Sequence, residues 1–233
     1  RPAFDAALAA HKAEIDAVAA DKAAPTFANT IEALERSGRA LDKVSNVFFV
    51  LAGANTSDAL EAVERDISPL LARHSNEFYL NAPLFRRIDE LYRRRDTLGL
   101  NAEQMRVLER YHTRFVRAGA ALDKTAQEKL AAINERLASL GTQFGQNVLA
   151  DEKSFALIVD EADLAGLPDF AKANAKAAAE ERGRPGKYAI TLARSSVESF
   201  LQFSSRRDLR EKMMTAWLAR GENGGKTDNR AIV

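Results

Sequence analysis

The sequence contains no cysteine and only three histidines in 233 residues. The missing cysteines exclude disulfide bonds, thiol catalysis and cysteine metal sites. No apolar run approaches the roughly 20 residues that cross a bilayer, and the first residues lack the layout of a signal peptide. Lys and Arg (34) balance Asp and Glu (33), so no net field attracts nucleic acid or an anionic membrane. We therefore expect a soluble globular protein, cytoplasmic by default, with neither nucleic acid nor a membrane as partner.

The three histidines do not have the spacing of a metal site. A zinc peptidase helix places two histidines four residues apart, so that both imidazoles face one ion. No pair among His11, His74 and His112 has that spacing, and each falls on an apolar helical face. We interpret all three as partly buried packing or surface residues, and the residues alone name no catalytic, cofactor-binding or metal-binding group.

Other short motifs have a structural explanation that we prefer to a functional one. Gly224 to Thr227 is similar to the end of a phosphate-binding loop, but the required first glycine is Arg220 and a helix precedes it instead of a buried strand. Ser195-Ser196 sits where a helix cap is expected, and Arg93 to Arg95 end a helix, where cations are favoured. The carboxylate pairs Asp151-Glu152 and Glu180-Glu181 fall in charged stretches that we expect to be exposed.

Most of the chain has the three-and-four apolar spacing of amphipathic helices. We predict one over Ala3 to Ala20, a long helix capped by Thr26 or Asn29 and bent at Gly38, and another that Pro69 kinks. Further helices are predicted after Asn81 and Asn101, over Pro168 to Arg182, after Ser195 or Ser196, after a Ser205–Asp208 capping box, and after Asp228.

The stretch Leu122 to Leu149 is the longest of these helices and organises the prediction. Asp123 is its expected N-cap. Its apolar residues form one face that we expect to be buried: Leu130, Ile133, Leu137, Leu140, Phe144 and Val148. Gly141 and Gly145 expose bare backbone one turn apart, which favours close packing of another element; a hinge is the alternative.

The period changes after Asp151. Phe155 to Val159 and Tyr188 to Leu192 are short runs rich in β-branched and aromatic residues, and we predict a two-stranded ribbon near residues 155–192. The prediction is a mainly α protein with two parts, a helical domain over 1–150 and a ribbon with helices over 151–233. The sequence begins and ends inside helical patterns, so we expect a fragment of a longer protein.

An ordered set of motifs resembles the N-terminal region of the thimet oligopeptidase family of zinc peptidases, and most closely its bacterial peptidyl-dipeptidase branch. The motifs are PTFANTI (25–31), LERSG (34–38), GANTS (53–57), LFRRI (84–88), FVRAGA (115–120), QFGQNV (143–148), RRDLRE (206–211), and Arg220-Gly221 followed by Asp228-Asn229. Each motif alone is weakly specific, but together they cover nearly the whole chain in the right order.

The resemblance implies a non-catalytic helical region that forms one wall of a channel admitting short peptides. Members of the family carry H-E-F-G-H and a later glutamate as zinc ligands, and no position from Arg1 to Val233 matches them. The intact parent is then a zinc metallopeptidase that hydrolyses oligopeptides, with short peptides and the missing catalytic region as partners, and this region alone is inactive. A stand-alone helical module that binds peptides or proteins without chemistry is the alternative.

Overall fold

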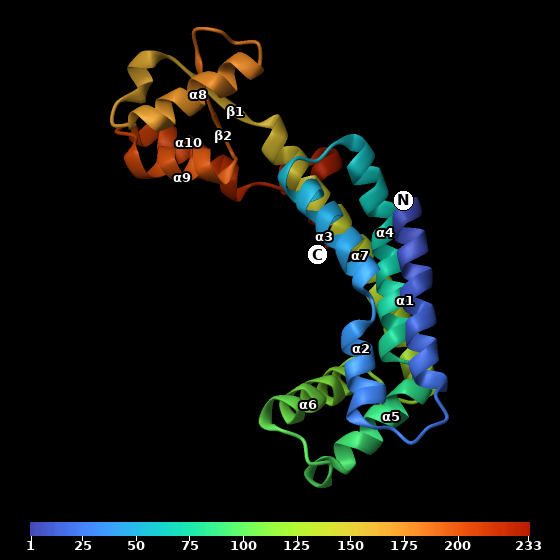
Figure 1. Cartoon of the computed structure of the whole chain (residues 1–233). Helices are drawn as coiled ribbons and strands as arrows, with labels where there is room; N and C mark the ends of the chain where they lie inside the picture. The colour runs from blue at the N-terminus through green and yellow to red at the C-terminus, as the bar shows by residue number, and fades with distance from the viewer. The chain divides into compact units, whose positions relative to one another are not determined.

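A computed structural model describes all residues from Arg1 to Val233. The chain forms two compact units, Arg1–Thr142 and Gln143–Val233. It is mainly helical, as predicted, and its strands form one two-stranded sheet (Figure 1). The longest helix, α7 (Lys124–Ser154), contributes residues to both units, and the division falls between Gly141 and Gly145.

The first unit consists of helices only. Three begin at the predicted caps Asn81, Asn101 and Asp123, and α4 begins after Ser57; each of these side chains accepts a hydrogen bond from a backbone amide of the following first turn. In chain order the helices are α1 (Pro2–Ala20), a π-helical turn (Phe27–Glu32), α2 (Ala33–Arg36), α3 (Arg39–Ala54), α4 (Asp58–Tyr79), α5 (Ala82–Arg93), a 3₁₀ turn (Arg95–Thr97), α6 (Ala102–Arg117) and α7.

Two apolar clusters hold the first unit together. The larger one gathers the fully buried side chains of α5 and α6 with residues of α1 and of the segment after Thr26. Its members are Ile15, Ile31, Leu34, Leu84, Ile88, Leu91, Leu108 and Phe115. The smaller cluster joins α1, α3 and α4 through Phe4, Ala7, Leu41 and Ile67. Helix α1 therefore packs on both clusters.

The segment after Thr26 differs from the single bent helix that we predicted. Thr26 and Asn29 form a capping box at the π-helical turn, and the chain then breaks at Ser37 and Gly38 before α3 begins. Gly38 adopts a φ of 75°, and a Cβ there would lie 3.0 Å from the His11 ring. Its amide donates to the Glu14 carboxylate at 2.7 Å. The chain is therefore broken here because Gly38 permits a left-handed residue against α1.

The apolar face of α7 is not buried as predicted. Its only buried residue is Asp151, whereas Ile133 is 54% exposed and Leu137 60% exposed. A Cβ at Gly141 or Gly145 would meet nothing within 4 Å, so no element packs closely on either glycine. The periodicity located the helix correctly, but Ile133, Leu137 and Phe144 of its apolar face are exposed and the other three residues are only half-buried.

Helix α7 faces α4 with polar groups instead. Asn76 is buried and donates to the Ala131 carbonyl at 3.2 Å, and the Asn134 side chain donates to Asn76 at 2.8 Å. Thr142 donates to Ser68 at 2.8 Å. These bonds satisfy buried polar atoms and fix the register of the two helices, but they bury little apolar surface.

The second unit contains the predicted ribbon. Strands β1 (Ala156–Val159) and β2 (Tyr188–Thr191) pair antiparallel, with Ala156 opposite Thr191. A 3₁₀ turn (Glu161–Leu164) and α8 (Asp169–Glu181) lie between the two strands in the chain, and α9 (Arg194–Phe203), α10 (Arg207–Leu218) and a last 3₁₀ turn (Gly225–Thr227) follow β2. Helices α8 and α9 contact β2, and α10 packs on α9.

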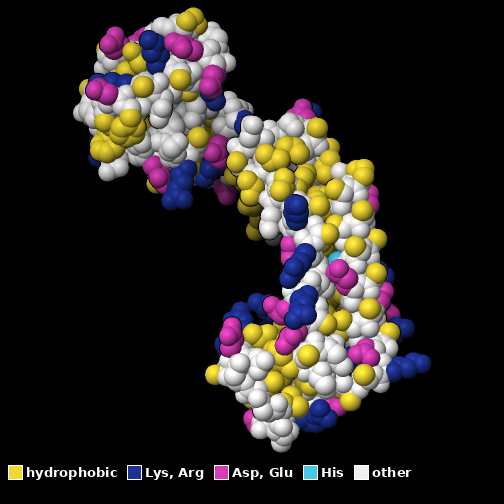
Figure 2. Space-filling model, viewed as in Figure 1, with side chains coloured by type: hydrophobic (Ala, Val, Ile, Leu, Met, Phe, Trp, Pro, Cys, Tyr) yellow, Lys and Arg dark blue, Asp and Glu magenta, His cyan; other side chains and the backbone are white.

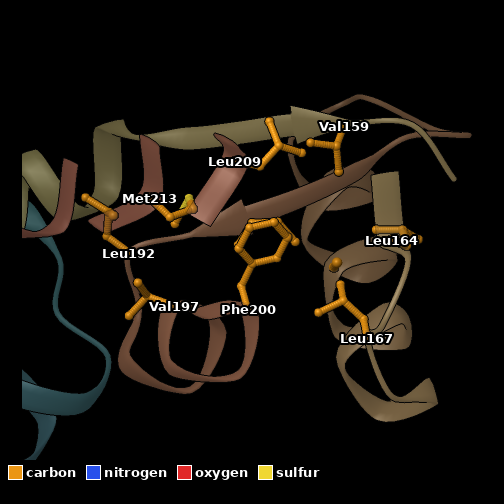
Figure 3. Close-up of a cluster of buried hydrophobic side chains, with 10 residues drawn as sticks. Val159, Leu164, Leu167, Leu192, Val197, Phe200, Leu209 and Met213 are labelled. Carbon is orange, nitrogen blue, oxygen red and sulfur yellow. The ribbon is translucent and has the colours of Figure 1, made fainter. Parts of the chain in front are cut away.

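Side chains from both strands and all three helices form one core (Figure 3). Phe200 projects from α9 toward the ribbon and is 1% exposed. Leu192, Val197 and Met213 are also buried in this core. The core gives a short ribbon, which is marginal alone, the packing that it needs.

Three predicted helix caps are wrong. Neither Ser195 nor Ser196 caps α9; the Ser196 hydroxyl accepts from the Thr191 amide at 3.0 Å instead. Asp208 pairs with Arg206, so no Ser205–Asp208 capping box forms. Asp228 binds Arg230, and no helix follows it. At Ser196 and Asp228 a nearby donor competes for the side chain that was expected to cap.

Candidate functional site

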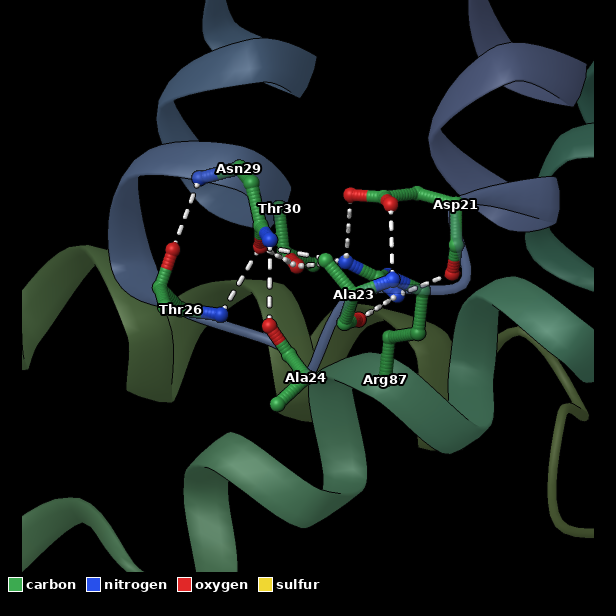
Figure 4. Close-up of polar contacts among 7 residues, drawn as sticks. All are labelled: Asp21, Ala23, Ala24, Thr26, Asn29, Thr30 and Arg87. Atoms are coloured by element: carbon green, nitrogen blue, oxygen red, sulfur yellow. Dashed lines mark hydrogen bonds and ion pairs between the residues drawn. The ribbon is translucent and has the colours of Figure 1, made fainter.

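Two of the motifs meet around Arg87 in the first unit (Figure 4). The side chain of Arg87 is 9% exposed and donates to the carbonyls of Asp21 and Ala23 at 2.7 and 2.9 Å. It also reaches Asn29 at 3.1 Å and Thr30 at 3.3 Å. The planar guanidinium thus fastens the loop before the π-helical turn to α5. We assign this network a structural role.

A second polar cluster surrounds Asp151 at the end of α7. Its carboxylate accepts from the Gly221 amide and the Asn223 side chain, both at 2.8 Å, and from the Thr227 hydroxyl. Asp151 is only 8% exposed, so our expectation of an exposed carboxylate pair is wrong. Its neighbour Glu152 binds Arg220 at 2.9 Å. The glycine-rich loop therefore holds a carboxylate of the chain itself.

These contacts determine the charge state of Asp151. Burial alone would raise its pKa, but hydrogen bonds from Thr227, Gly221 and Asn223 outweigh burial and hold the pKa of this carboxyl below its usual range. Asp151 is therefore ionised at neutral pH and acts as a fixed acceptor. A carboxyl with this pKa is unsuited to donate a proton in catalysis.

Asn229 completes the second cluster. It is 3% exposed, donates to the Phe144 carbonyl at 3.2 Å and accepts from Asn147 at 2.8 Å. Its backbone amide donates to the Gly221 carbonyl at 2.6 Å. Gly221 has a φ of 77°, and a Cβ there would lie 2.7 Å from the Asn229 side chain. A residue larger than glycine at position 221 would therefore clash with Asn229.

The three histidines lie apart from both clusters. His11 and His74 contact each other, with 2.9 Å between ring nitrogens, and His112 lies 3.1 Å from Asp89 and stacks on Tyr92. Partial burial lowers the pKa of His11 and of His74. No three His, Asp or Glu side chains gather in a way that could hold a metal ion. The residues present do not fit a zinc site.

An open groove of about 640 Å³ runs beside β1 in the second unit. Phe155 and Leu157 of the strand segment form one side, and Ala216 and Ala219 at the end of α10 form the other. Polar side chains of α10 and Asn223 complete the lining: Asp208, Glu211, Lys212, Thr215 and Asn223. Asp151 holds Asn223, so the second polar cluster also fixes one end of this groove.

The groove suits an extended chain better than a compact ligand. Strand β1 pairs with β2 on one side only, which leaves the other backbone edge free to pair. An extended peptide added to such an edge gains main-chain hydrogen bonds, while its alternate side chains enter the groove. We therefore name this feature, lined as above, the β1 groove.

Comparison with known proteins agrees with the motif pattern. No family model matches the chain. The dipeptidyl carboxypeptidases of Escherichia coli and Salmonella typhimurium are 41% and 39% identical over the full length of the chain, and oligopeptidase A of Salmonella typhimurium is 30% identical over the same length. Over its full length the chain matches a part of the thimet oligopeptidase family. It spans about a third of the length of these relatives, 34% to 35%.

The motifs that carry this similarity also supply residues of the two polar clusters. PTFANTI and LFRRI supply Asn29, Thr30 and Arg87, and QFGQNV supplies Phe144 and Asn147 for Asn229. Four of the quoted motifs therefore supply polar contacts of the two clusters: PTFANTI, LFRRI, QFGQNV, and Arg220-Gly221 with Asp228-Asn229. None of the chain's helices is both long and apolar enough to cross a membrane.

Sequence reasoning missed Asp151 and the β1 groove. The signal for Asp151 was its place at the end of the longest helix, with an amide-rich and glycine-rich loop far along the chain. The groove had no signal, because its two sides lie far apart in the sequence and only the fold brings them together.

Proposed function

We propose that the whole protein is a cytoplasmic zinc-dependent oligopeptidase that releases dipeptides from the C-termini of short peptides. Residues 1–150 form a helical part of its substrate-channel wall, and residues 151–233 begin the segment that joins the catalytic region. The zinc ligands lie outside residues 1–233. The observation that carries the proposal is 41% identity to a dipeptidyl carboxypeptidase over the full length of this chain.

The reaction is tested on the full-length protein. It is incubated with a peptide blocked at its N-terminus, and the products are identified by mass spectrometry. We expect sequential loss of C-terminal dipeptides, abolished by a chelator and restored by zinc. Internal cleavage alone would contradict the dipeptidyl specificity, and no cleavage would contradict the peptidase assignment.

Within this proposal, the β1 groove of residues 151–233 adds a second peptide-contacting surface to the wall that residues 1–150 form. Its concave apolar lining, its charged rim and the free edge of β1 support this role. A groove that binds substrate and transition state equally affects KM and leaves kcat unchanged.

A bulky side chain tests the groove. Thr215 lines it, and Met214 is an exposed residue of the same helix that does not. In the full-length protein, we expect Thr215→Trp to raise KM several-fold with kcat retained, and Met214→Trp to change neither constant. Equal KM values for the two variants would contradict the proposal that the groove contacts the peptide.

The groove also favours the second candidate function, a helical module that holds peptides without cleaving them. Full-length protein that binds the blocked peptide, releases no dipeptide with zinc present and loses binding in Thr215→Trp would favour this candidate.

A further inference from the structure

The side of α7 opposite α4 carries an apolar stripe, defined here as Ile133, Leu137 and Leu140. At 3.6 residues per turn, these residues lie across the helix from Ala131, Glu135 and Thr142, which face α4. Ile133 and Leu137 are 54% and 60% exposed. A third side of the helix, which includes Ala132 and Arg136, is exposed and polar apart from alanine. The stripe is therefore a distinct surface and is not simply the solvent side of α7.

A second exposed apolar surface belongs to the same unit. The C-terminal half of α3 is apolar all round: Ala52 is buried on one side, while Val47, Val50 and Leu51 are 59%, 67% and 48% exposed on another. Figure 2 shows hydrophobic side chains gathered over this half of the helix. A helix segment that is apolar all round is one that is covered on every side.

We propose that the stripe of α7 is the docking surface for a helix from the part of the full-length protein outside residues 1–233. The chain spans about a third of its relatives' length. The remaining two thirds of such a protein are long enough to contain the docking helix. The stripe carries no charge and is convex, and so suits a packed helix better than an extended peptide. Gly141 lies at its edge with nothing within 4 Å of its Cβ position, which permits close helix approach.

This inference rests on the chain being part of a longer oligopeptidase and does not depend on the reaction. Such packing excludes water from the stripe, and the exposure seen at Ile133 and Leu137 is then a property of residues 1–233 alone. The apolar half of α3 is covered by other parts of the same missing region.

Thiol labelling of the full-length protein tests the proposal. Residues 1–233 contain no cysteine, so Leu137→Cys and Ala132→Cys each introduce one thiol at a position exposed in this structure. Each variant is treated with N-ethylmaleimide under native conditions, and modification is measured by mass spectrometry on the peptide that carries the new cysteine. We expect the thiol at position 137 to react at least about tenfold more slowly than the thiol at position 132.

Two results would overturn the proposal. Equal rates at the two positions would show that nothing covers the stripe. Protection of position 137 that disappears on dilution would assign the surface to a second copy of the protein. The labelling experiment does not depend on enzymatic activity. If position 137 is protected but the protein cleaves no peptide, the docking proposal is supported and the proposed function is contradicted.

Discussion

Helices α5 and α7 have similar apolar periodicity but different surroundings. Helix α5 has 12 residues and fully buries Leu84, Ile88 and Leu91. Helix α7 has 31 residues, yet its single buried residue is the charged Asp151. The comparison teaches that an amphipathic pattern predicts that a face will be covered, but not which part of the chain covers it.

The largest expected difference comes from one substitution made in both helices. Leu91→Ala removes a side chain that is 0% exposed and should lower the free energy of unfolding by about 2–5 kcal/mol, through lost burial and a cavity. Leu137→Ala, at a residue 60% exposed, should change it by less than about 0.5 kcal/mol in the 233-residue chain. Urea denaturation followed by circular dichroism checks both values. Equal losses of unfolding free energy in the two variants would contradict the claim that α5 is covered and α7 is not.

The second largest loss of stability is expected for substitutions of Asp151, the one buried residue of α7. Asp151→Ala leaves the Gly221 amide and two side chains without their acceptor, and we expect a loss of about 3 kcal/mol. Asp151→Asn keeps the shape of the side chain and should lose less. Urea denaturation of the 233-residue chain measures the stability of both variants. Glu180→Ala, which removes an exposed carboxylate of the same unit, is the control. An Asp151→Ala variant as stable as this control would contradict the claim that the hydrogen bonds to Asp151 stabilise this unit.

The buried arginine of α5 provides a smaller effect. Arg87→Lys keeps the charge but loses the fork that reaches two carbonyls and the side chains of Asp21, Asn29 and Thr30, so we expect a loss of about 1–2 kcal/mol. Arg86→Lys, at the less buried neighbouring position, should change stability by less than about 0.5 kcal/mol. Thermal unfolding of the two variants, measured side by side, decides whether Arg87 fastens the loop.

The smallest effect concerns the His11–His74 contact between α1 and α4. Burial lowers both pKa values, so the unfolded state binds more protons as the pH falls below about 6.5, and stability is then lost. Glu14, Asp42 and Glu77 oppose this shift, whereas Lys12 adds to it for His74. Unfolding at about pH 7.5 and about pH 5.5 measures the loss, which should be smaller in His74→Gln. An unchanged pH dependence in that variant would contradict this origin.

The sequence predicted elements better than it predicted surroundings. Local signals located α5, α6 and the ribbon, because caps such as Asn81 and Asn101 act within one helical turn. The break at Gly38 depends on His11 and Glu14 of another helix, and the burial of Asp151 depends on a loop about 70 residues away. The site was harder still: RRDLRE contains Asp208 and Glu211 of the lining, but no motif marks the strand side of the β1 groove.

The most direct measurement of the central claim is thermal unfolding of the full-length protein with one charge introduced on α7. Leu137→Asp places a carboxylate in the apolar stripe, and Ala132→Asp places the same charge on the polar side of the same helix. We predict that Leu137→Asp lowers Tm by about 5 °C or more and that Ala132→Asp lowers it by less than about 1 °C. Equal Tm values for the two variants would contradict the claim that another part of the protein covers the stripe.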